Sequence, residues 1–150
     1  MMILDHEAIG GFMTYCGWNS TLEGFFAGLP MVTWPVFAEQ FFNENFVTQI
    51  LRIGVAVGAQ QWARFVGDSI KSEAIEKAVF RIMVGAEAEE IRSRARELGK
   101  KAKKAVEEGG SSYSDLSSLI EELRSHGIAG AANKNKLIFL FRPNYKIQKV

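Results

Sequence analysis

The chain has 150 residues, of which 47% are hydrophobic, and this is enough for one globular domain with a buried core. A formal net charge of +1 gives no electrostatic reason to expect binding to nucleic acid or to an anionic membrane. The single cysteine excludes an internal disulfide framework and, with no signal peptide visible, favours a reducing compartment, so we expect a cytoplasmic protein.

The N-terminal part of the chain alternates between strand and helix signals. Glycines bound a short apolar run at residues 10–15, which predicts a buried strand. A helix is predicted from Asn19 or Ser20 to Ala27, where Gly28 ends it. Further elements follow in the order strand, helix, strand, at residues 31–34, 39–51 and 54–58. This order predicts an α/β fold with a parallel sheet.

After a predicted loop at residues 60–68, the chain reads as helical. Apolar residues at helical spacing predict a helix at 71–84, and a longer helix at 86–108 begins with glutamates and ends with lysines, which complements the helix dipole. Ser112 or Ser114 can cap a final helix, which has apolar residues on one face: Leu116, Leu119, Ile120 and Leu123. The charge runs are interpreted as a solvated helix surface.

The composition changes near the C-terminus. Residues 128–150 contain no acidic residue and five basic ones: Lys134, Lys136, Arg142, Lys146 and Lys149. This segment could be a loose tail, a membrane-surface anchor or sequence of accidental origin, and its weak amphipathic pattern favours the last over an anchor. We therefore expect a structured domain at residues 1–126, an atypical, disordered basic tail at 127–150, and no membrane association.

The turn before the first helix carries the strongest functional signal. Gly17 lies between a strand and a helix, so the first N–H groups of the helix can bind phosphate. Asn19 and Ser20 add side-chain donors, and Glu23 can accept hydrogen bonds from ribose hydroxyls one turn further on. The segment from Ser20 to Glu23 also fits a capping box that only satisfies the helix end, and the spacing alone slightly favours capping.

A second polar pair, Glu39 and Gln40, opens the next predicted helix. A carboxylate accepts hydrogen bonds from sugar hydroxyls and an amide both donates and accepts, so the pair could hold a hexose. An acidic residue in a first helical turn is also common without any ligand. Both polar groups would lie at the carboxyl ends of adjacent parallel strands, where open α/β sheets bind ligands, and this coincidence favours the functional interpretation.

The other aromatic, cysteine and histidine residues are interpreted structurally. Three aromatic residues are expected in the core: Phe12, Trp34 and Trp62. Cys16 is expected to be a small buried side chain, His6 to be structural and His126 to lie on the surface. The sequence contains no P-loop, no Gly-x-Gly-x-x-Gly and no zinc-type spacing.

One continuous stretch resembles the signature box of plant UDP-sugar glycosyltransferases. It contains His6, Gly10-Gly11-Phe12, Thr14-Tyr15-Cys16-Gly17-Trp18-Asn19-Ser20, Glu23, Gly28-Leu29-Pro30, Trp34-Pro35 and Glu39-Gln40. The similarity continues through the helices to about Ser125 and does not include residues 128–150. The resemblance implies a GT-B fold, of which this chain would form part of the Rossmann-like C-terminal domain that holds the donor.

The resemblance also implies a role for residues of the box. Asn19 and Ser20 would contact the α-phosphate, Glu23 the ribose hydroxyls, and Trp18 would shape the phosphate pocket. Two residues would bind the sugar: Glu39 and Gln40. A glutamine at the second of these positions usually accompanies glucose as donor. The full UDP-binding set would be Tyr15, Gly17, Trp18, Asn19, Ser20 and Glu23.

Three departures from the family pattern bear on function. Tyr15 stands where the family has a histidine that contacts the diphosphate. The Trp-Ala-Pro-Gln stretch, whose tryptophan stacks on uracil, is missing, and so is the acceptor domain with its catalytic histidine. We therefore expect no catalytic residue in this chain and no turnover by the chain alone.

These features favour the C-terminal, donor-binding part of an inverting UDP-glycosyltransferase. It would be a monomer whose partners are a UDP-sugar, with glucose as the expected hexose, and a small lipophilic acceptor such as a flavonoid or triterpenoid. No cofactor is expected. The alternative is a non-catalytic truncated product or a sugar-nucleotide-binding module.

Overall fold

Three short parallel strands form the sheet around which the described residues up to Lys104 are arranged. The computed structural model describes residues 3–60 and 70–125. The strands are β1 (Phe12–Thr14), β2 (Met31–Thr33) and β3 (Gly54–Ala56), in the spatial order β1-β2-β3, with Met13 opposite Val32 and Val32 opposite Val55. The predicted strands and their parallel arrangement are confirmed, although each is shorter than predicted. The burial predicted for the first strand is only partly correct, because β1 lies at the edge of the sheet and Met13 is exposed.

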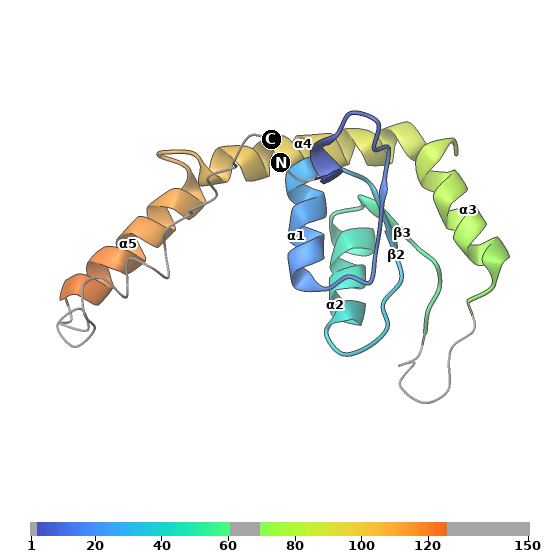
Figure 1. Ribbon diagram of the computed structural model, residues 1–150, viewed down its shortest axis with the longest axis horizontal. Helices are drawn as coiled ribbons and strands as arrows, with labels where there is room; N and C mark the ends of the chain where they lie inside the picture. Colours follow the sequence, from blue (N-terminus) through green and yellow to red (C-terminus); the bar gives the residue numbers. More distant parts are fainter. Residues whose placement is uncertain (1–2, 61–69, 126–150) are drawn as a thin grey trace, which may run out of the picture. The chain divides into compact units, whose positions relative to one another are not determined.

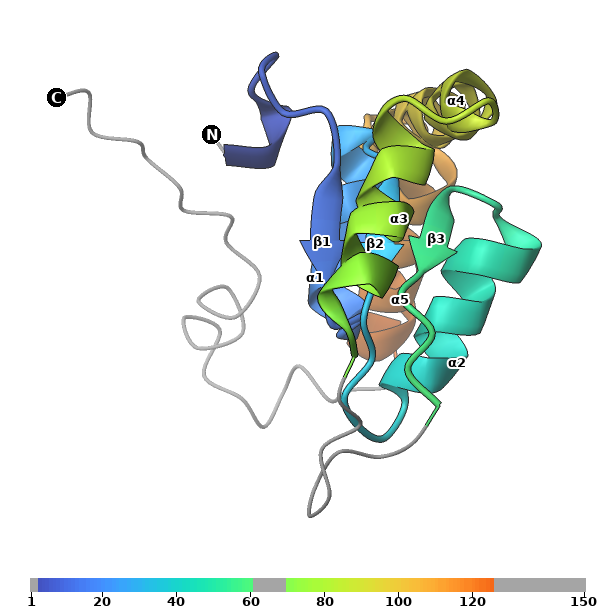
Figure 2. The ribbon, with the colours of Figure 1, turned by 90° about the vertical axis from the view of Figure 1, so that its right-hand side faces the viewer.

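Helices cover both faces of this sheet. On one side lie α1 (Trp18–Ala27) and α2 (Gln40–Asn45), and on the other lies α3 (Ser72–Met83), as the edge-on view of Figure 1 and the turned view of Figure 2 both show. Successive residues of β2 point to opposite faces, so Met31 and Val32 belong to two different core clusters. The result is a three-layer α/β/α arrangement with a Rossmann-like order of elements.

The second helix differs from its prediction. The sequence predicts one helix at 39–51, whereas α2 continues after Asn45 as a π-helical turn, η2 (Phe46–Ile50). The N–H of Leu51 donates to the carbonyl of Phe46, five residues earlier, at 2.9 Å. Helix propensity and apolar spacing do not distinguish an α turn from a π turn, which explains why the sequence did not show this feature.

Close contact between α1 and α4 (Ala88–Val106) depends on two glycines. Gly28 ends α1, as predicted, with a φ of 69° in the left-handed region. A Cβ atom on Gly99 of α4 would lie 2.8 Å from the Cα of Gly28 and 3.0 Å from its nitrogen. A side chain at Gly99 would therefore require the backbone to move, and its absence lets α4 lie directly against the end of α1.

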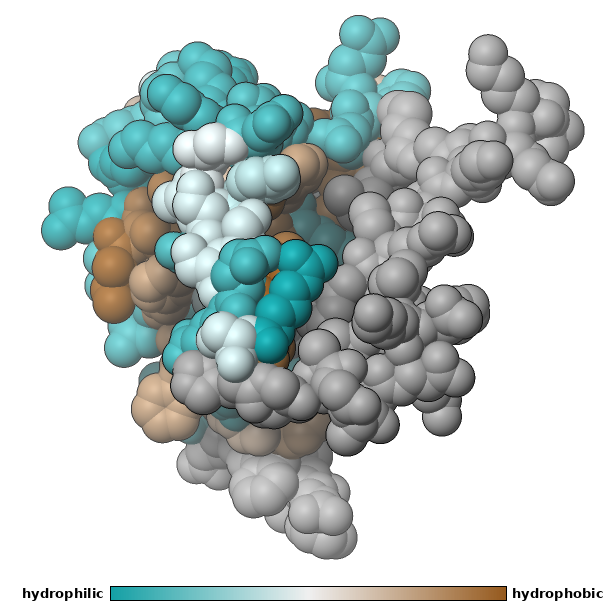
Figure 3. Space-filling view, turned by 90° about the vertical axis from the view of Figure 1, so that its left-hand side faces the viewer, coloured by the Kyte–Doolittle hydropathy of each residue, from teal (hydrophilic) through white to brown (hydrophobic). Residues whose placement is uncertain are grey.

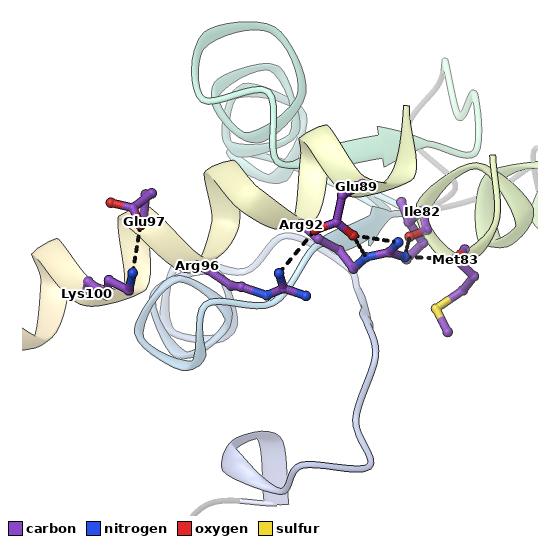
Figure 4. Close-up of polar contacts among 7 residues, drawn as sticks. All are labelled: Ile82, Met83, Glu89, Arg92, Arg96, Glu97 and Lys100. Carbon is purple, nitrogen blue, oxygen red and sulfur yellow. Dashed lines mark hydrogen bonds and ion pairs between the residues drawn. The ribbon is translucent and has the colours of Figure 1, made fainter. Parts of the chain in front are cut away.

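An arginine joins α4 to α3. The guanidinium of Arg92 donates to the carbonyl oxygens of Ile82 and Met83, at 3.1 and 2.8 Å, in the last turn of α3 (Figure 4). It also bonds to Glu89 on its own helix, at 3.0 Å from Nη2. A cation at a helix C-terminus satisfies carbonyls that have no partner within the helix and complements the dipole.

The charged residues of α4 form the predicted solvated surface. Its first turn carries Glu89 and Glu90, and its last turn carries Lys103 and Lys104, so the predicted charge order is confirmed. The exposed pair Glu97–Lys100, at 2.8 Å, is one of several ion pairs between neighbouring turns (Figure 4). Such exposed pairs contribute little to stability. The charges of α4 are therefore explained by neighbouring charges on the same helix, without a bound ligand.

The chain divides into two units between Lys104 and Ala105, and α5 (Ser111–Ser125) lies in the second. This helix begins at Ser111, where the N–H of Ser114 already bonds to the carbonyl of Gly110 at 2.9 Å. The predicted capping by Ser112 or Ser114 is therefore wrong, since both residues lie inside the helix. The apolar face predicted for it is present, but Leu116 and Leu119 are exposed.

The surface of the described residues includes large exposed hydrophobic side chains. Examples from the first unit are Ile3, Phe42, Ile50, Phe80 and Val84. Figure 3 shows hydrophobic residues open to view beside hydrophilic ones on one face of the molecule. Single exposed apolar residues are normal on proteins and assign no function by themselves.

Four predictions lie outside the described residues: most of the loop at 60–68, the core position of Trp62, the surface position of His126 and the disordered tail at 127–150. Within residues 3–60 and 70–125, no helix has both the length and the apolar character needed to cross a bilayer.

Candidate functional site

The predicted site residues gather where β1 and β2 end. Each strand leads through a short turn into a helix: Tyr15 and Gly17 lie in the turn before α1, and Glu39 lies in the turn before α2. The other predicted residues lie at the starts of the helices, namely Trp18, Asn19, Ser20 and Glu23 in α1 and Gln40 in α2. Tyr15 and Trp18 are 62% and 48% exposed. The side chains of Asn19, Glu23 and Glu39 are also exposed, and Ser20 and Gln40 are half-buried. The sequence thus placed two polar clusters at the carboxyl ends of adjacent parallel strands, and the structure has them there.

The N-terminus of α1 lacks a side-chain cap. The helix begins at Trp18 after Gly17, and within the described residues no side chain caps it. The carbonyl of Gly17 accepts hydrogen bonds from the N–H of Thr21 at 2.9 Å and from its hydroxyl at 3.0 Å. Ser20 lies inside the first turn, so the alternative interpretation of Ser20 to Glu23 as a capping box is wrong.

The absence of a side-chain cap among the described residues leaves backbone N–H donors free at the N-terminus of α1. The first N–H groups of a helix have no acceptor within the helix, and in α1 these belong to Trp18, Asn19 and Ser20. The hydroxyl of Ser20 and the amide of Asn19 lie on the same turn. Helix N-termini of this kind stabilise phosphate through unpaired N–H groups and the helix dipole.

Cys16, just before this helix, has a strained backbone conformation. Cys16 has a φ of 62°, which is uncommon for any residue other than glycine, asparagine or aspartate. Its N–H donates to the hydroxyl oxygen of Thr14 at 3.1 Å, and its side chain is fully buried. Burial and the neighbouring Glu44 raise the pKa of the Cys16 thiol to about 12. The predicted burial of Cys16 is confirmed.

Gln40 has a structural task beside the one predicted for it. Its Oε1 accepts hydrogen bonds from the N–H groups of Val36 and Phe37, at 2.8 and 3.1 Å, and so shapes the loop between β2 and α2. These bonds orient the amide and leave its NH₂ group as the part that can donate to a ligand. Glu39 precedes α2 and is exposed.

Sequence reasoning missed the residues that support this site. Asn43 Nδ2 donates to the carbonyl of Cys16 at 2.8 Å, and Glu44 Oε2 accepts from the hydroxyl of Thr33 at 2.7 Å. Burial raises the pKa of Glu44, and the hydrogen bond from Thr33 opposes that shift. Asn43 and Glu44 follow Gln40 by three and four residues, so they share its helix face, and this spacing was the available signal.

Aromatic contacts complete the surroundings of the two turns. Tyr15 and Trp34 meet edge to face with ring centroids 6.4 Å apart, and the ring centroids of Trp18 and Phe46 are 6.5 Å apart. Trp34 and Phe12 are partly buried and pack against the two core clusters, which confirms their predicted core positions. His6 has a local structural role, because its Nδ1 accepts a hydrogen bond from the N–H of Ala8 at 3.1 Å.

A cavity of about 340 Å³ lies elsewhere, beside the start of β3. Its lining includes Arg52, Arg81, Glu87 and Arg94. Arg81 is paired with Glu87, and Arg94 with Glu90 and the carbonyl of Arg52. None of the predicted site residues lines it, and Arg81, Glu87 and Arg94 each already have a partner.

Comparisons with known proteins agree with this arrangement. The chain is 54% identical over 130 residues to a scopoletin glucosyltransferase of Nicotiana tabacum, covering 87% of this chain and 27% of that protein. It is 60% identical over 124 residues to UDP-glucosyl transferase 73M2 of Saponaria officinalis, covering 82% and 25%. The chain thus spans about a quarter of the length of these relatives.

Solved structures show the same fold. The crystal structure of Glycyrrhiza uralensis UGT73P12 complexed with glycyrrhetinic acid 3-O-monoglucuronide is similar with a TM-score of 0.78 and 44% identity, over 92% of this chain and 29% of that one. Os79 from O. sativa in complex with UDP gives a TM-score of 0.71 and 34% identity, over 79% and 25%. These proteins have the GT-B fold, and the expectation of a partial Rossmann-like domain of that fold is confirmed.

The family itself is identified over most of the chain. Residues 1–93, which include both strand-end turns, match the family described as UDP-glucoronosyl and UDP-glucosyl transferase. The identities above 50% with the tobacco and Saponaria relatives extend this match into the helical part. The chain belongs to the UDP-glucoronosyl and UDP-glucosyl transferase family.

Proposed function

We propose that this chain is the donor-binding part of an inverting UDP-glycosyltransferase that transfers glucose to a hydroxyl of a small lipophilic acceptor. The residues at the end of β1 stabilise the departing UDP, and a base from the acceptor-binding part of the complete protein deprotonates the acceptor hydroxyl. The chain itself supplies charge stabilisation and positioning, which are large contributions in such reactions. Relatives named for scopoletin and flavonoids, and one crystallised with a triterpenoid glucuronide, support this acceptor class.

The site residues divide between two groups of the donor. Asn19 and Ser20, with Tyr15, Gly17 and Trp18 around them, bind the diphosphate, and Glu23 accepts hydrogen bonds from the ribose. Glu39 and the NH₂ group of Gln40 bind hydroxyls of the glucose. The observation that carries the proposal is the uncapped N-terminus of α1 at the carboxyl end of β1, in a chain of this family.

The same proposal includes the domain boundaries, the binding partners and the cellular compartment. We expect residues 1–126 to act as the donor-binding domain, with 127–150 as a separate tail. The partners are a UDP-sugar and a small acceptor, and solved relatives in complex with UDP support the first of these. The single cysteine, buried and without a disulfide, supports a reducing compartment such as the cytoplasm, and we expect a monomer.

Calorimetric titration of the full chain with UDP tests the donor site. A double variant, Ser20→Ala/Glu23→Ala, removes one proposed phosphate contact and the proposed ribose contact. The matched control, Glu108→Ala/Ser112→Ala, makes the same changes at exposed residues of the other unit. We expect saturable binding by the wild type and the control, and at least about tenfold weaker binding by the double variant. A folded wild-type chain that does not bind UDP contradicts the proposal.

Transfer activity needs the rest of the protein and is tested in a chimera. The chain replaces the corresponding segment of the Nicotiana tabacum relative, to which it is 54% identical. Transfer of glucose from UDP-glucose to scopoletin by the chimera, reduced by Glu39→Ala, is the expected result. A folded chimera that binds UDP-glucose without turnover would favour a donor-binding module that has lost catalysis.

Tyr15 is the observation that favours this second candidate. The resemblance places a histidine at this position, and a histidine can become cationic whereas a tyrosine cannot. The ring of Tyr15 packs against Trp34 and offers a phenol hydroxyl instead. If the tyrosine weakens donor binding, Tyr15→His should tighten UDP binding several-fold, and more at pH 6 than at pH 8. Unchanged affinity would remove the support for a non-catalytic module.

A further inference from the structure

Asn43 links two segments that lie far apart in the sequence. Its Nδ2 donates a hydrogen bond of 2.8 Å to the carbonyl oxygen of Cys16, 27 residues away. Asn43 lies on α2, about one turn after Gln40, and Cys16 lies in the turn that leads into α1. The bond therefore joins the helix that carries the proposed sugar residues to the turn that presents the proposed phosphate residues.

The carbonyl that Asn43 holds belongs to a strained residue. Cys16 has a left-handed φ of 62° and is fully buried, so its peptide groups need partners from the protein. Thr14 accepts the hydrogen bond from its N–H at 3.1 Å, and Asn43 donates to its carbonyl. The turn is thus fixed on one side by the end of β1 and on the other by α2.

The next residue on α2 holds the neighbouring strand. Glu44 accepts a hydrogen bond of 2.7 Å from the hydroxyl of Thr33, the last residue of β2. The two strand ends are themselves joined, because the N–H of Trp34 donates to the carbonyl of Thr14 at 2.9 Å. Consecutive side chains of α2 therefore bond to the chain at the ends of β1 and β2, and of the two only Asn43 reaches the turn before α1.

We propose that Asn43 is a positioning residue that keeps the sugar half-site on α2 in register with the phosphate half-site at the start of α1. The inference deepens the proposed function and rests on it. A UDP-sugar spans both half-sites, whereas UDP contacts only the half-site at α1. Losing the Asn43 bond should therefore weaken UDP-glucose binding more than UDP binding, since only the first ligand needs both helices at a fixed separation.

The test compares two ligands across matched variants of the full chain. Asn43→Ala removes the side-chain donor, and Asn43→Asp keeps the size but replaces the donor with an acceptor. Asn45→Ala, at an exposed position on the same helix, is the control. We expect both Asn43 variants to lose about tenfold in affinity for UDP-glucose and no more than about threefold for UDP, with the control unchanged. A general loss of structure would lower both affinities by the same factor, so equal losses, or none, overturn the proposal.

A measurement without ligand separates this inference from the proposed function. In amide NMR spectra of the free protein, the Gly17 and Trp18 resonances should shift in both Asn43 variants and stay in place in Asn45→Ala. If the wild type binds neither UDP nor UDP-glucose, the proposed function fails, and these spectra decide alone whether Asn43 positions the turn. Unchanged Gly17 and Trp18 resonances overturn the inference whatever the binding data show. If Asn43→Ala does not fold, the Asp variant carries both measurements.

Discussion

Arg92 is the residue whose replacement tests most sharply how α3 and α4 are joined. Its guanidinium donates to two carbonyl oxygens in the last turn of α3, at 3.1 and 2.8 Å, and its side chain is 25% exposed (Figure 4). Arg92→Ala removes both bonds and the cation at the helix terminus. The two carbonyls lie near the surface, so water can replace part of what is lost.

The magnitude follows from these two bonds. A hydrogen bond from a charged group contributes about 1.5–3 kcal/mol when it is shielded, and much less when the acceptor is exposed. The bond to Ile82 is partly buried and the bond to Met83 is exposed. We therefore expect Arg92→Ala to lower the free energy of unfolding by about 2 kcal/mol, with the exposed pair to Glu89 adding little.

Urea denaturation followed by circular dichroism measures this change. The midpoint should fall with an unchanged m value, since the surface exposed on unfolding stays the same. Arg92→Lys, which cannot donate to both carbonyls in the same planar geometry, should give an intermediate loss. Arg96→Ala is the control, because Arg96 is more exposed and pairs with the same Glu89. If Arg92→Ala unfolds at the same midpoint as Arg96→Ala, the capping argument is wrong.

Three further predictions follow from burial and close contact. Gly99→Ala should lower the free energy of unfolding by about 1–3 kcal/mol, despite the better helix propensity of alanine, because the new Cβ would lie 2.8 Å from the Cα of Gly28; an unchanged melting temperature would contradict this. Burial raises the pKa of Glu44 above its ordinary value of 4.5, so the folded state binds the proton more tightly and stability falls as pH rises from 4.5 through the raised pKa. Glu44→Gln, which can still accept from Thr33, should flatten that part of the stability profile, and an identical profile would count against the buried carboxylate. Because burial raises the pKa of Cys16 to about 12, a disulfide reagent at pH 8 should leave the native thiol unmodified and react only after unfolding; rapid reaction of the folded chain would refute this.

The sequence predicted the order of elements because the signals were local. Glycines and prolines marked the ends of strands, and Gly28 ended α1 where predicted. The π turn at Phe46–Ile50 was not predictable in the same way, since an apolar stripe with a 3.6-residue period does not specify which carbonyl each N–H will reach. The contact of Gly99 with Gly28 was also hidden, because it depends on how two distant helices approach.

The position of the candidate site could be predicted from the sequence, but the hydrogen bonds that hold its residues in place could not. Polar residues after adjacent strands must meet at one edge of a parallel sheet, so Asn19 and Glu39 could be placed from spacing alone. The alternative that Ser20 caps α1 came from a four-residue pattern, and it is wrong because the helix already begins at Trp18, after Gly17. The bond from Asn43 to Cys16 crosses 27 residues and depends on a left-handed backbone at a cysteine, which no residue propensity indicates.

In the proposed function, the turn at the end of β1 and the start of α1 binds the diphosphate of a UDP-sugar. Titrating UDP into the isotope-labelled full chain while following backbone amide resonances tests it most directly. We expect the resonances of Trp18, Asn19 and Ser20 to shift with one saturable affinity, while those around the cavity at Arg52 and Arg94 do not move. Shifts confined to the arginine-lined cavity, or a spectrum unchanged by UDP, would contradict it.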